Sequence, residues 1–123
     1  METQKTYPAE ELKKRTKQFA IRIVKLYQAL PKRDEGRVVG RQVLRSGTSV
    51  AANYRAVCRA RSRAEFVAKI GLVVEEIDET VFWLELLVET GIVARSRMES
   101  LHNEATELLA IFAASQRTAR VVS

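Results

Sequence analysis

The spacing of helix-ending signals constrains this chain more than any other feature of its sequence. Pro8 stands just before two acids, Glu10 and Glu11, an order that suits a first helical turn because the helix dipole stabilises negative charge there. The helix that begins at Pro8 runs to Pro31, where a proline would clash with a continuing helix. The polar residues after Pro31 then make a short connection.

The other two joints contain no proline. Ser62 is followed three residues later by Glu65, which is the spacing of a capping box, so a new helix begins at Ser62. Gly91 supplies the left-handed residue that commonly ends a helix. Together these signals predict four helices, at about residues 8–30, 34–60, 62–90 and 94–120.

Each predicted helix carries one apolar stripe when its residues are projected at about 100° per residue. Gly40 and Gly47 fall in the stripe of the second helix, where they would allow another helix to approach closely. Ser46, Ser49 and Asn53 border that stripe, either as polar contacts between helices or as surface residues. Four stripes need one shared core, and long helices with short links pack as antiparallel neighbours. The predicted fold class is therefore all-α, an antiparallel up-down-up-down four-helix bundle that forms a single domain over residues 1–123.

Cysteine and histidine are too few for a disulfide or a metal site. Cys58 is the only cysteine and is expected to act as a small buried apolar residue. Glu99 and His102 have the Glu-x-x-His spacing of di-iron bundles, but such a site needs a second pair and His102 is the only histidine. No glycine-rich phosphate loop and no nucleophile with a matching base is present. We therefore expect no catalytic residue, no metal, no cofactor and no small-molecule substrate, so the protein is not predicted to be an enzyme.

The sequence also bears on location. The first residues are charged and lack the apolar core of a signal peptide. No window approaches the roughly 18 apolar residues of a membrane span. We expect a cytoplasmic protein without a membrane partner.

Positive and negative charges are segregated between the second and third predicted helices. Residues 36–63 contain seven basic residues and no acid, whereas residues 64–91 contain seven acids and one lysine. On the helical projection five arginines share a sector of about 80°, roughly opposite the apolar stripe, and span about 33 Å. This arginine row consists of Arg37, Arg41, Arg45, Arg55 and Arg59. Arg61 and Arg63 are assigned to the joint that follows and not to the row.

A row of arginines favours a partner over plain solvation. Mixed charges or lysine would serve solubility equally well, whereas arginine makes planar bidentate contacts to phosphate or carboxylate. Lys13, Lys14 and Lys17 add basic surface on the first helix, in a chain whose net charge is +6. RNA or DNA is a candidate partner, bound through its phosphates without base reading.

The third predicted helix has a second apolar sector outside its core stripe. A monomeric bundle does not need such a sector, so we expect a subunit interface and a homo-oligomer. The acids within it could pair with arginines of a neighbouring subunit, which would engage the arginine row without nucleic acid. The predicted interface residues are Leu72, Glu76, Glu79, Phe82, Trp83 and Leu86, and Leu87 falls in the same sector.

Two motifs, RSGTSVAANY from Arg45 and RSRAEF from Arg61, resemble the signature of a bacterial family of four-helix-bundle proteins. These proteins are encoded within intervening sequences of 23S ribosomal RNA genes. The resemblance implies a homopentameric ring of bundles. It also implies a relation to accessory proteins of diversity-generating retroelements, which engage nucleic acid and a reverse transcriptase. The matching positions are Arg45, Ser46, Ser49, Val50, Asn53, Ser62, Glu65, Phe66 and Glu79.

The leading functional prediction is a non-enzymatic homo-oligomeric bundle that binds RNA or other nucleic acid through its basic face, without sequence specificity. The alternative is an oligomeric protein-interaction scaffold whose arginines form salt bridges between subunits and that binds no nucleic acid.

Overall fold

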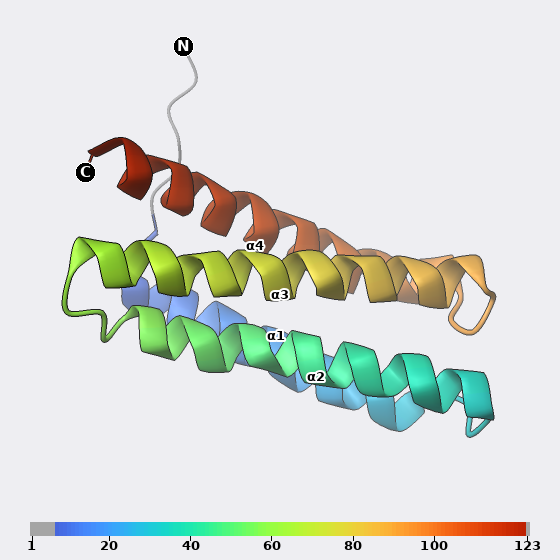
Figure 1. Ribbon diagram of the computed structural model, residues 1–123. Helices are drawn as coiled ribbons and strands as arrows, with labels where there is room; N and C mark the ends of the chain where they lie inside the picture. Colours follow the sequence, from blue (N-terminus) through green and yellow to red (C-terminus); the bar gives the residue numbers. More distant parts are fainter. Residues whose placement is uncertain (1–6, 123) are drawn as a thin grey trace, which may run out of the picture.

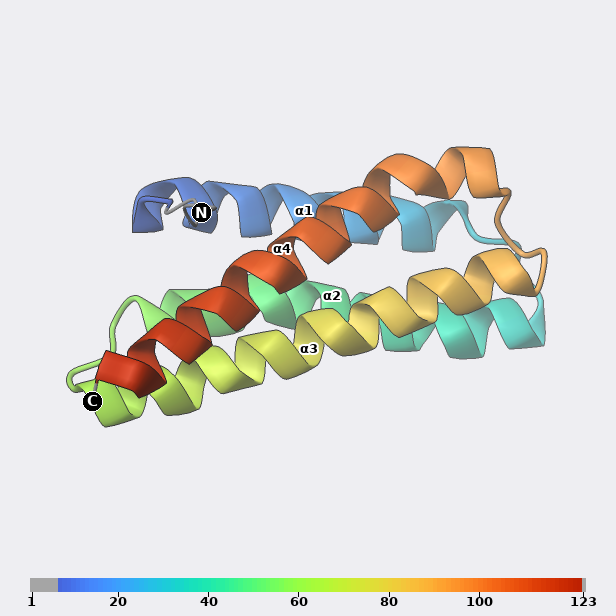
Figure 2. The same ribbon diagram turned by 90° about the horizontal axis from the view of Figure 1, so that it is seen from above.

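Four α-helices form an antiparallel bundle in the computed structural model, which describes residues 7–122 (Figure 1). Successive helices reverse direction at each short joint, so the predicted up-down-up-down fold class is confirmed (Figures 1 and 2). The predicted domain also included residues 1–6 and 123, which lie outside the described residues. The helices are α1 (Ala9–Ala29), α2 (Asp34–Val57), α3 (Arg63–Glu89) and α4 (Arg95–Val122).

Helix ends lie close to their predicted positions. Ser62 is the N-cap of α3, and its Oγ accepts a hydrogen bond from the backbone N–H of Glu65 at 3.1 Å. Gly91 follows α3 with a φ of +75°, the left-handed conformation that favours glycine. Pro8 was predicted within the first turn but is the N-cap of α1, because the helix begins at Ala9.

The second helix is shorter than predicted. It ends at Val57 rather than near residue 60, because the chain tightens into a turn there. The N–H of Arg59 donates to the carbonyl of Ala56 at 3.1 Å, and the N–H of Ala60 donates to that of Val57 at 3.0 Å. These bonds span three residues instead of the four of an α-helix. Arg59 therefore stands in the joint between α2 and α3, just beyond the helix.

Glycines bring α1 and α2 close together, as the sequence predicted. A Cβ on Gly47 would lie 2.7 Å from Ile23 Cγ1, and one on Gly40 would lie 2.8 Å from Leu30 Cδ1. Only glycine leaves room for these side chains without a shift of the neighbouring atoms. Gly47 faces Ile23 and Gly40 faces Leu30, so residue numbers rise along one helix as they fall along the other. This antiparallel pairing sets the first half of α1 beside the second half of α2.

The third helix packs against both α2 and α4. Ile77 and Leu84 are fully buried, as predicted from the apolar stripe. Leu87 is also fully buried, which corrects its assignment to the outer apolar sector. Thr80 adds a buried polar residue that the apolar stripe did not include. Thr80 and Leu87 continue the three- and four-residue spacing of Ile77 and Leu84, so the buried residues of α3 lie on one stripe.

Ser46 joins α2 to α3 inside this core. Its Oγ lies 2.9 Å from Thr80 Oγ1, and both residues are fully buried. Of the two interpretations of Ser46, contact between helices is the one that holds. Ser49 instead donates to the carbonyl of Arg45 in its own helix, at 2.6 Å.

The fourth helix contacts α1 over a short stretch only. Figure 2 shows α4 running obliquely from the end of α1 towards the start of α3. Arg15 spans this seam, since its Nε and Nη2 donate to Glu104 at 3.1 and 2.7 Å and Nη2 lies 3.2 Å from Glu107. The guanidinium also lies over the ring of Tyr7, 5.5 Å from its centroid. The hydrogen bond to Glu104 raises the pKa of Arg15 above its usual value.

Candidate nucleic-acid interface

Most of the predicted arginine row is exposed and has no partner within the described part of the chain. Arg37, Arg41, Arg55 and Arg59 are all exposed. Among residues 7–122, none of these four side chains forms an ion pair or a hydrogen bond. They therefore remain available to an external anion.

Arg45 differs because its guanidinium is engaged within the chain. Its Nε and Nη2 donate to Gln42 Oε1 at 3.3 and 3.1 Å. Nη1 lies 3.4 Å from Glu76 Oε2, and Nη2 pairs with Glu79. Antiparallel packing of α2 and α3 thus places Arg45 beside Glu76 and Glu79 within one chain, while pairing of these acids with a neighbouring subunit stays a prediction.

The engagement of Arg45 divides the row into two basic groups. Arg37 and Arg41 lie near the α1–α2 joint, whereas Arg55 and Arg59 lie near the α2–α3 joint. The interval from Arg41 to Arg55 is about 21 Å along the α2 axis. An extended polyanion would therefore meet two separate positive regions instead of one continuous row.

A hollow of about 570 Å³ lies at the α2–α3 joint, and we call it the joint hollow. Arg61 lines it together with Arg55 and Arg59, although the sequence placed Arg61 in the corner, outside the row. The turn that ends α2 at Val57 brings Arg59 and Arg61 to the side on which Arg55 projects. Its complete lining is Ala52, Arg55, Ala56, Arg59, Arg61, Glu65 and Lys69.

A second hollow of about 470 Å³ lies at the α1–α2 joint. Arg37, Arg41 and Lys32 supply its positive charge. The other lining residues are all neutral: Tyr27, Gln28, Leu30, Pro31 and Gly36.

The predicted lysines of α1 differ in their availability. Lys13 forms an ion pair with Glu10 at 3.1 Å, whereas Lys14 and Lys17 are exposed. The glycine contacts set the first half of α1 beside the second half of α2, so these lysines are level with Arg55 rather than with Arg37.

The outer apolar sector of α3 is partly exposed. Leu72 and Phe82 are 50% and 54% exposed, while Trp83 and Leu86 are half-buried. Trp83 Nε1 donates to Glu79 at 2.9 Å, and its ring meets Phe82 edge-on with centroids 4.9 Å apart. The sector therefore adjoins the ion pairs of Arg45.

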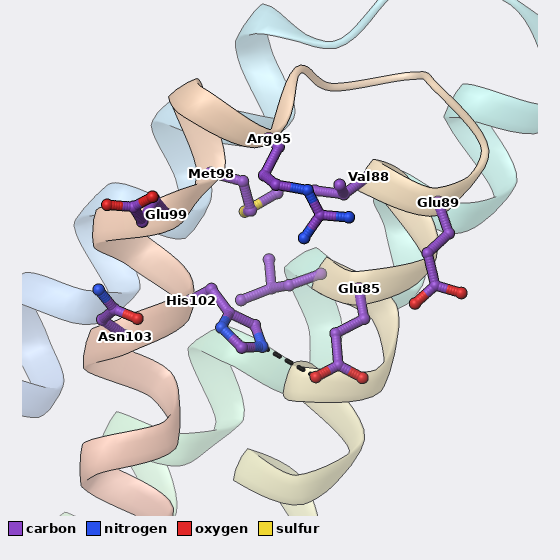
Figure 3. A pocket seen from close by; sticks show the side chains of 9 residues that line it. Glu85, Val88, Glu89, Arg95, Met98, Glu99, His102 and Asn103 are labelled. Atoms are coloured by element: carbon purple, nitrogen blue, oxygen red, sulfur yellow. Dashed lines mark hydrogen bonds and ion pairs between the residues drawn. The ribbon is translucent and has the colours of Figure 1, made fainter.

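A pocket of about 440 Å³ lies between the end of α3 and the start of α4 (Figure 3). His102 Nε2 lies 2.8 Å from Glu85 Oε2, while the carboxylate of Glu99 points away from this pair (Figure 3). The Glu-x-x-His spacing thus does not bring Glu99 and His102 to a common ligand. Among residues 7–122 no group of three His, Cys, Asp or Glu side chains could hold a metal ion.

Two other features concern the predicted partners and the lone cysteine. In the described part of the chain, no helix combines the length and apolar character needed to cross a membrane. Cys58 is half-buried in the turn after α2, beside the apolar core.

Comparison with known proteins identifies a family, and solved structures include a relative with the same fold. Residues 10–114 match the family described as 23S rRNA-intervening sequence protein. A crystal structure of a protein with unknown function from the S23 ribosomal protein family of Bacteroides thetaiotaomicron VPI-5482 is 38% identical, with a TM-score of 0.82. The similarity covers 89% of this chain and 97% of that one. No curated protein matches the chain.

Proposed function

The chain belongs to the 23S rRNA-intervening sequence protein family, and from that premise we propose that it is a homo-oligomeric bundle that binds RNA through the phosphate backbone. The family description names ribosomal RNA, and the crystallised relative is assigned to a ribosomal protein family. RNA is therefore the first nucleic acid to test. No enzymatic step is part of this proposal.

The unpaired arginines of α2 carry the proposal. Four exposed guanidiniums lie on or next to a helix that has no acid after Glu35. Arginine stays charged throughout the physiological pH range, so this face holds counterions until a polyanion displaces them. Contacts of this kind follow the backbone and need no base reading.

A charge reversal at one end of α2 tests RNA binding. We expect Arg37→Glu with Arg41→Glu to weaken binding of a structured RNA at least about tenfold at 0.1 M salt, measured by fluorescence anisotropy. Arg45 is left intact, because a glutamate there would add a third carboxylate beside Glu76 and Glu79. The matched control is Arg95→Glu with Arg97→Glu, which changes the net charge equally in the exposed first turn of α4.

The outcomes separate specific from general charge effects. A loss confined to the α2 variant supports RNA binding at this face. An equal loss in both variants would mean that net charge alone attracts the RNA. Unchanged binding by the α2 variant would overturn the proposal for this surface.

The outer apolar sector of α3 supports oligomerisation. Leu72 and Phe82 are half-exposed large apolar side chains on one helix, and large exposed apolar patches are typical of interaction sites. A ring of five subunits is the size that the family resemblance implies. We expect Phe82→Glu to lower the native mass to that of a monomer, whereas Ile21→Glu on α1, 38% exposed, leaves it unchanged. An unchanged mass for Phe82→Glu would remove the α3 interface.

One observation favours the scaffold alternative. Glu75 and Asp78 on α3 are exposed and have no ion-pair partner among residues 7–122. They could receive Arg37 and Arg41 of a neighbouring subunit. In that case Arg37→Glu with Arg41→Glu would dissociate the oligomer, and wild-type protein would bind no RNA. The relation to diversity-generating retroelement proteins that the resemblance implies also fits this alternative. Those accessory proteins engage a reverse transcriptase, which is a protein partner.

A further inference from the structure

The joint hollow is lined by three arginines and a lysine, whereas two arginines and a lysine line the α1–α2 hollow. We propose that the joint hollow is a phosphate-binding site, which anchors the RNA backbone to the bundle. This inference deepens the proposed RNA binding and rests on it. The groups that would bind the phosphate are the guanidiniums of Arg55, Arg59 and Arg61 and the ammonium of Lys69.

The single acid of the hollow does not neutralise these arginines. Glu65 Oε1 lies 3.9 Å from Lys69 Nζ, and its Oε2 accepts from the backbone N–H of Arg61 at 3.4 Å. The side chains of Arg55, Arg59 and Arg61 form no ion pair with residues 7–122. Three guanidiniums thus line one hollow without an ion pair to its single carboxylate.

The helix dipole explains only one of these arginines. A basic residue in the last turn of a helix is stabilised by the negative end of the dipole, and Arg55 occupies that turn. Arg59 and Arg61 lie after Val57, beyond the helix end, so this effect does not account for them. Like charges that line one hollow repel one another, and a bound anion would offset that repulsion.

The shape of the hollow suits an oxyanion. Ala52 and Ala56 line it without long side chains, which leaves room between the arginines. The joint is held in place, because Ser62 caps α3 and Glu65 binds the backbone of Arg61. A preformed arrangement loses little entropy when a ligand binds.

Phosphate fits this arrangement better than carboxylate does. One arginine satisfies both oxygens of a carboxylate through a bidentate contact. A phosphate offers further oxygens and can accept from several guanidiniums at once. The α1–α2 hollow lacks this convergence, since Tyr27, Leu30 and Pro31 take the place of further cations.

Two variants with equal charge loss test the site. The hollow variant is Arg55→Gln, Arg59→Gln and Arg61→Gln, and the matched control is Lys32→Gln, Arg37→Gln and Arg41→Gln. We expect the hollow variant to bind a structured RNA on the order of 10²-fold more weakly and to lower the log–log salt slope by about 2 to 3. The control should lose less affinity, because its cations do not converge with a third arginine.

Pyrophosphate tests the site without RNA. At ten times its Kd it should raise the Tm of wild-type and control proteins by about 5 °C, and it should leave the Tm of the hollow variant unchanged. Arg55→Lys with Arg59→Lys keeps the charge but removes the forked donors, so it should weaken the pyrophosphate effect. An undiminished shift in this lysine variant would overturn the role of the forked guanidinium donors.

The two assays separate failure of the site from failure of the proposed function. If RNA binds but both triple variants lose affinity equally and pyrophosphate stabilises none of the proteins, the joint hollow is not the anchor and RNA binding stands. If wild-type protein binds no RNA at 50 mM salt, the proposed function is wrong. In that case a pyrophosphate shift that the hollow variant abolishes assigns the site to a free phosphorylated ligand, and the absence of any shift overturns the site too.

Discussion

Ser46 and Thr80 join α2 to α3 by a hydrogen bond between fully buried hydroxyls, whereas Arg15 joins α1 to α4 by ion pairs nearer the surface. The α2–α3 seam extends along both helices, while the α1–α4 seam is short because α4 runs obliquely (Figure 2). Short side chains therefore suffice in the first seam, and a long arginine is needed to span the second.

This difference indicates where the bundle would open first. A seam with few buried apolar contacts and partly exposed polar ones has the lower local stability. The α1–α4 seam fits that description, whereas the α1–α2, α2–α3 and α3–α4 seams are all extensively packed. The joint hollow is built on α2 and α3, so it belongs to the more rigid part of the molecule.

The largest effect is expected where a close seam is forced apart. Gly47→Val adds a branched side chain where even a Cβ would lie 2.7 Å from Ile23 Cγ1, and Ile23 is fully buried. We expect a loss of about 3 kcal/mol in the free energy of unfolding, measured by urea denaturation. A loss below about 1 kcal/mol would show that α1 and α2 can separate easily and would remove the contrast between the seams.

Gly71→Ala is the control for that substitution. A Cβ on Gly71 meets only Gln116 Nε2 at 2.9 Å, and this is the end of a flexible side chain that can move aside. Alanine favours the helix over glycine by about 1 kcal/mol, so a small gain in stability is expected. If Gly47→Val lowers the free energy of unfolding and Gly71→Ala raises it, then local packing, and not the loss of glycine itself, determines the change in stability.

A smaller effect is expected from the buried hydroxyl pair. Each hydroxyl has one proton, so Ser46 and Thr80 share one hydrogen bond while the other proton goes to the carbonyl of Gln42 or Glu76. Thr80→Val leaves Ser46 without this partner and should cost about 1 to 2 kcal/mol. The double variant Ser46→Ala with Thr80→Val should cost less than the sum of the single losses. Additive losses would mean that the two hydroxyls do not act together.

We expect a substitution in the α1–α4 seam to change the local opening of these helices more than the free energy of global unfolding. Glu104→Gln removes one charge from the Arg15 ion pair, whose side chains are 20% and 22% exposed, and should cost about 1 kcal/mol. Faster hydrogen exchange should be confined to α1 and α4. Exchange that rises equally in α3 would contradict a separate seam.

The Arg15 ion pair also predicts a pH dependence. The pKa of Arg15 is raised in the folded protein, so its contribution is complete below the pKa of the unfolded state and is lost only as the pH rises through the folded value. Between about pH 6 and pH 9, ionisation of Arg15 should therefore leave stability unchanged. The difference in unfolding free energy between wild type and Arg15→Met, measured across this range, checks the prediction.

Sequence alone predicted the helices because their end signals act locally. Ser62 and Glu65 formed the expected cap, and Gly91 adopted the expected left-handed conformation. Leu87 was placed wrongly, although it continues the three- and four-residue spacing of Ile77 and Leu84, because the polar Thr80 interrupts the apolar pattern there.

The candidate site was less predictable than the helix ends, because it depends on contacts between helices. The row of arginines could be read from spacing on one helix, but the partner of Arg45 lies on another helix. Arg61 joined the site only because α2 ends in a turn at Val57. Such contacts depend on how helices and joints are placed in three dimensions, and no local signal in the sequence reports them.

The smallest effect is expected at the outer rim of the tight seam. The Arg45 side chain is 48% exposed, more than twice the 20% of Arg15, so water screens its pairs with Glu76 and Glu79 more strongly. Arg45→Gln should therefore cost only about 0.5 kcal/mol and less than Glu104→Gln. Because Arg45 is already engaged, the same variant should lower RNA affinity less than Arg41→Gln does, measured at equal salt. A larger loss for Arg45→Gln would mean that its guanidinium leaves Glu76 and Glu79 to meet phosphate, and the arginine row would then act as one continuous surface.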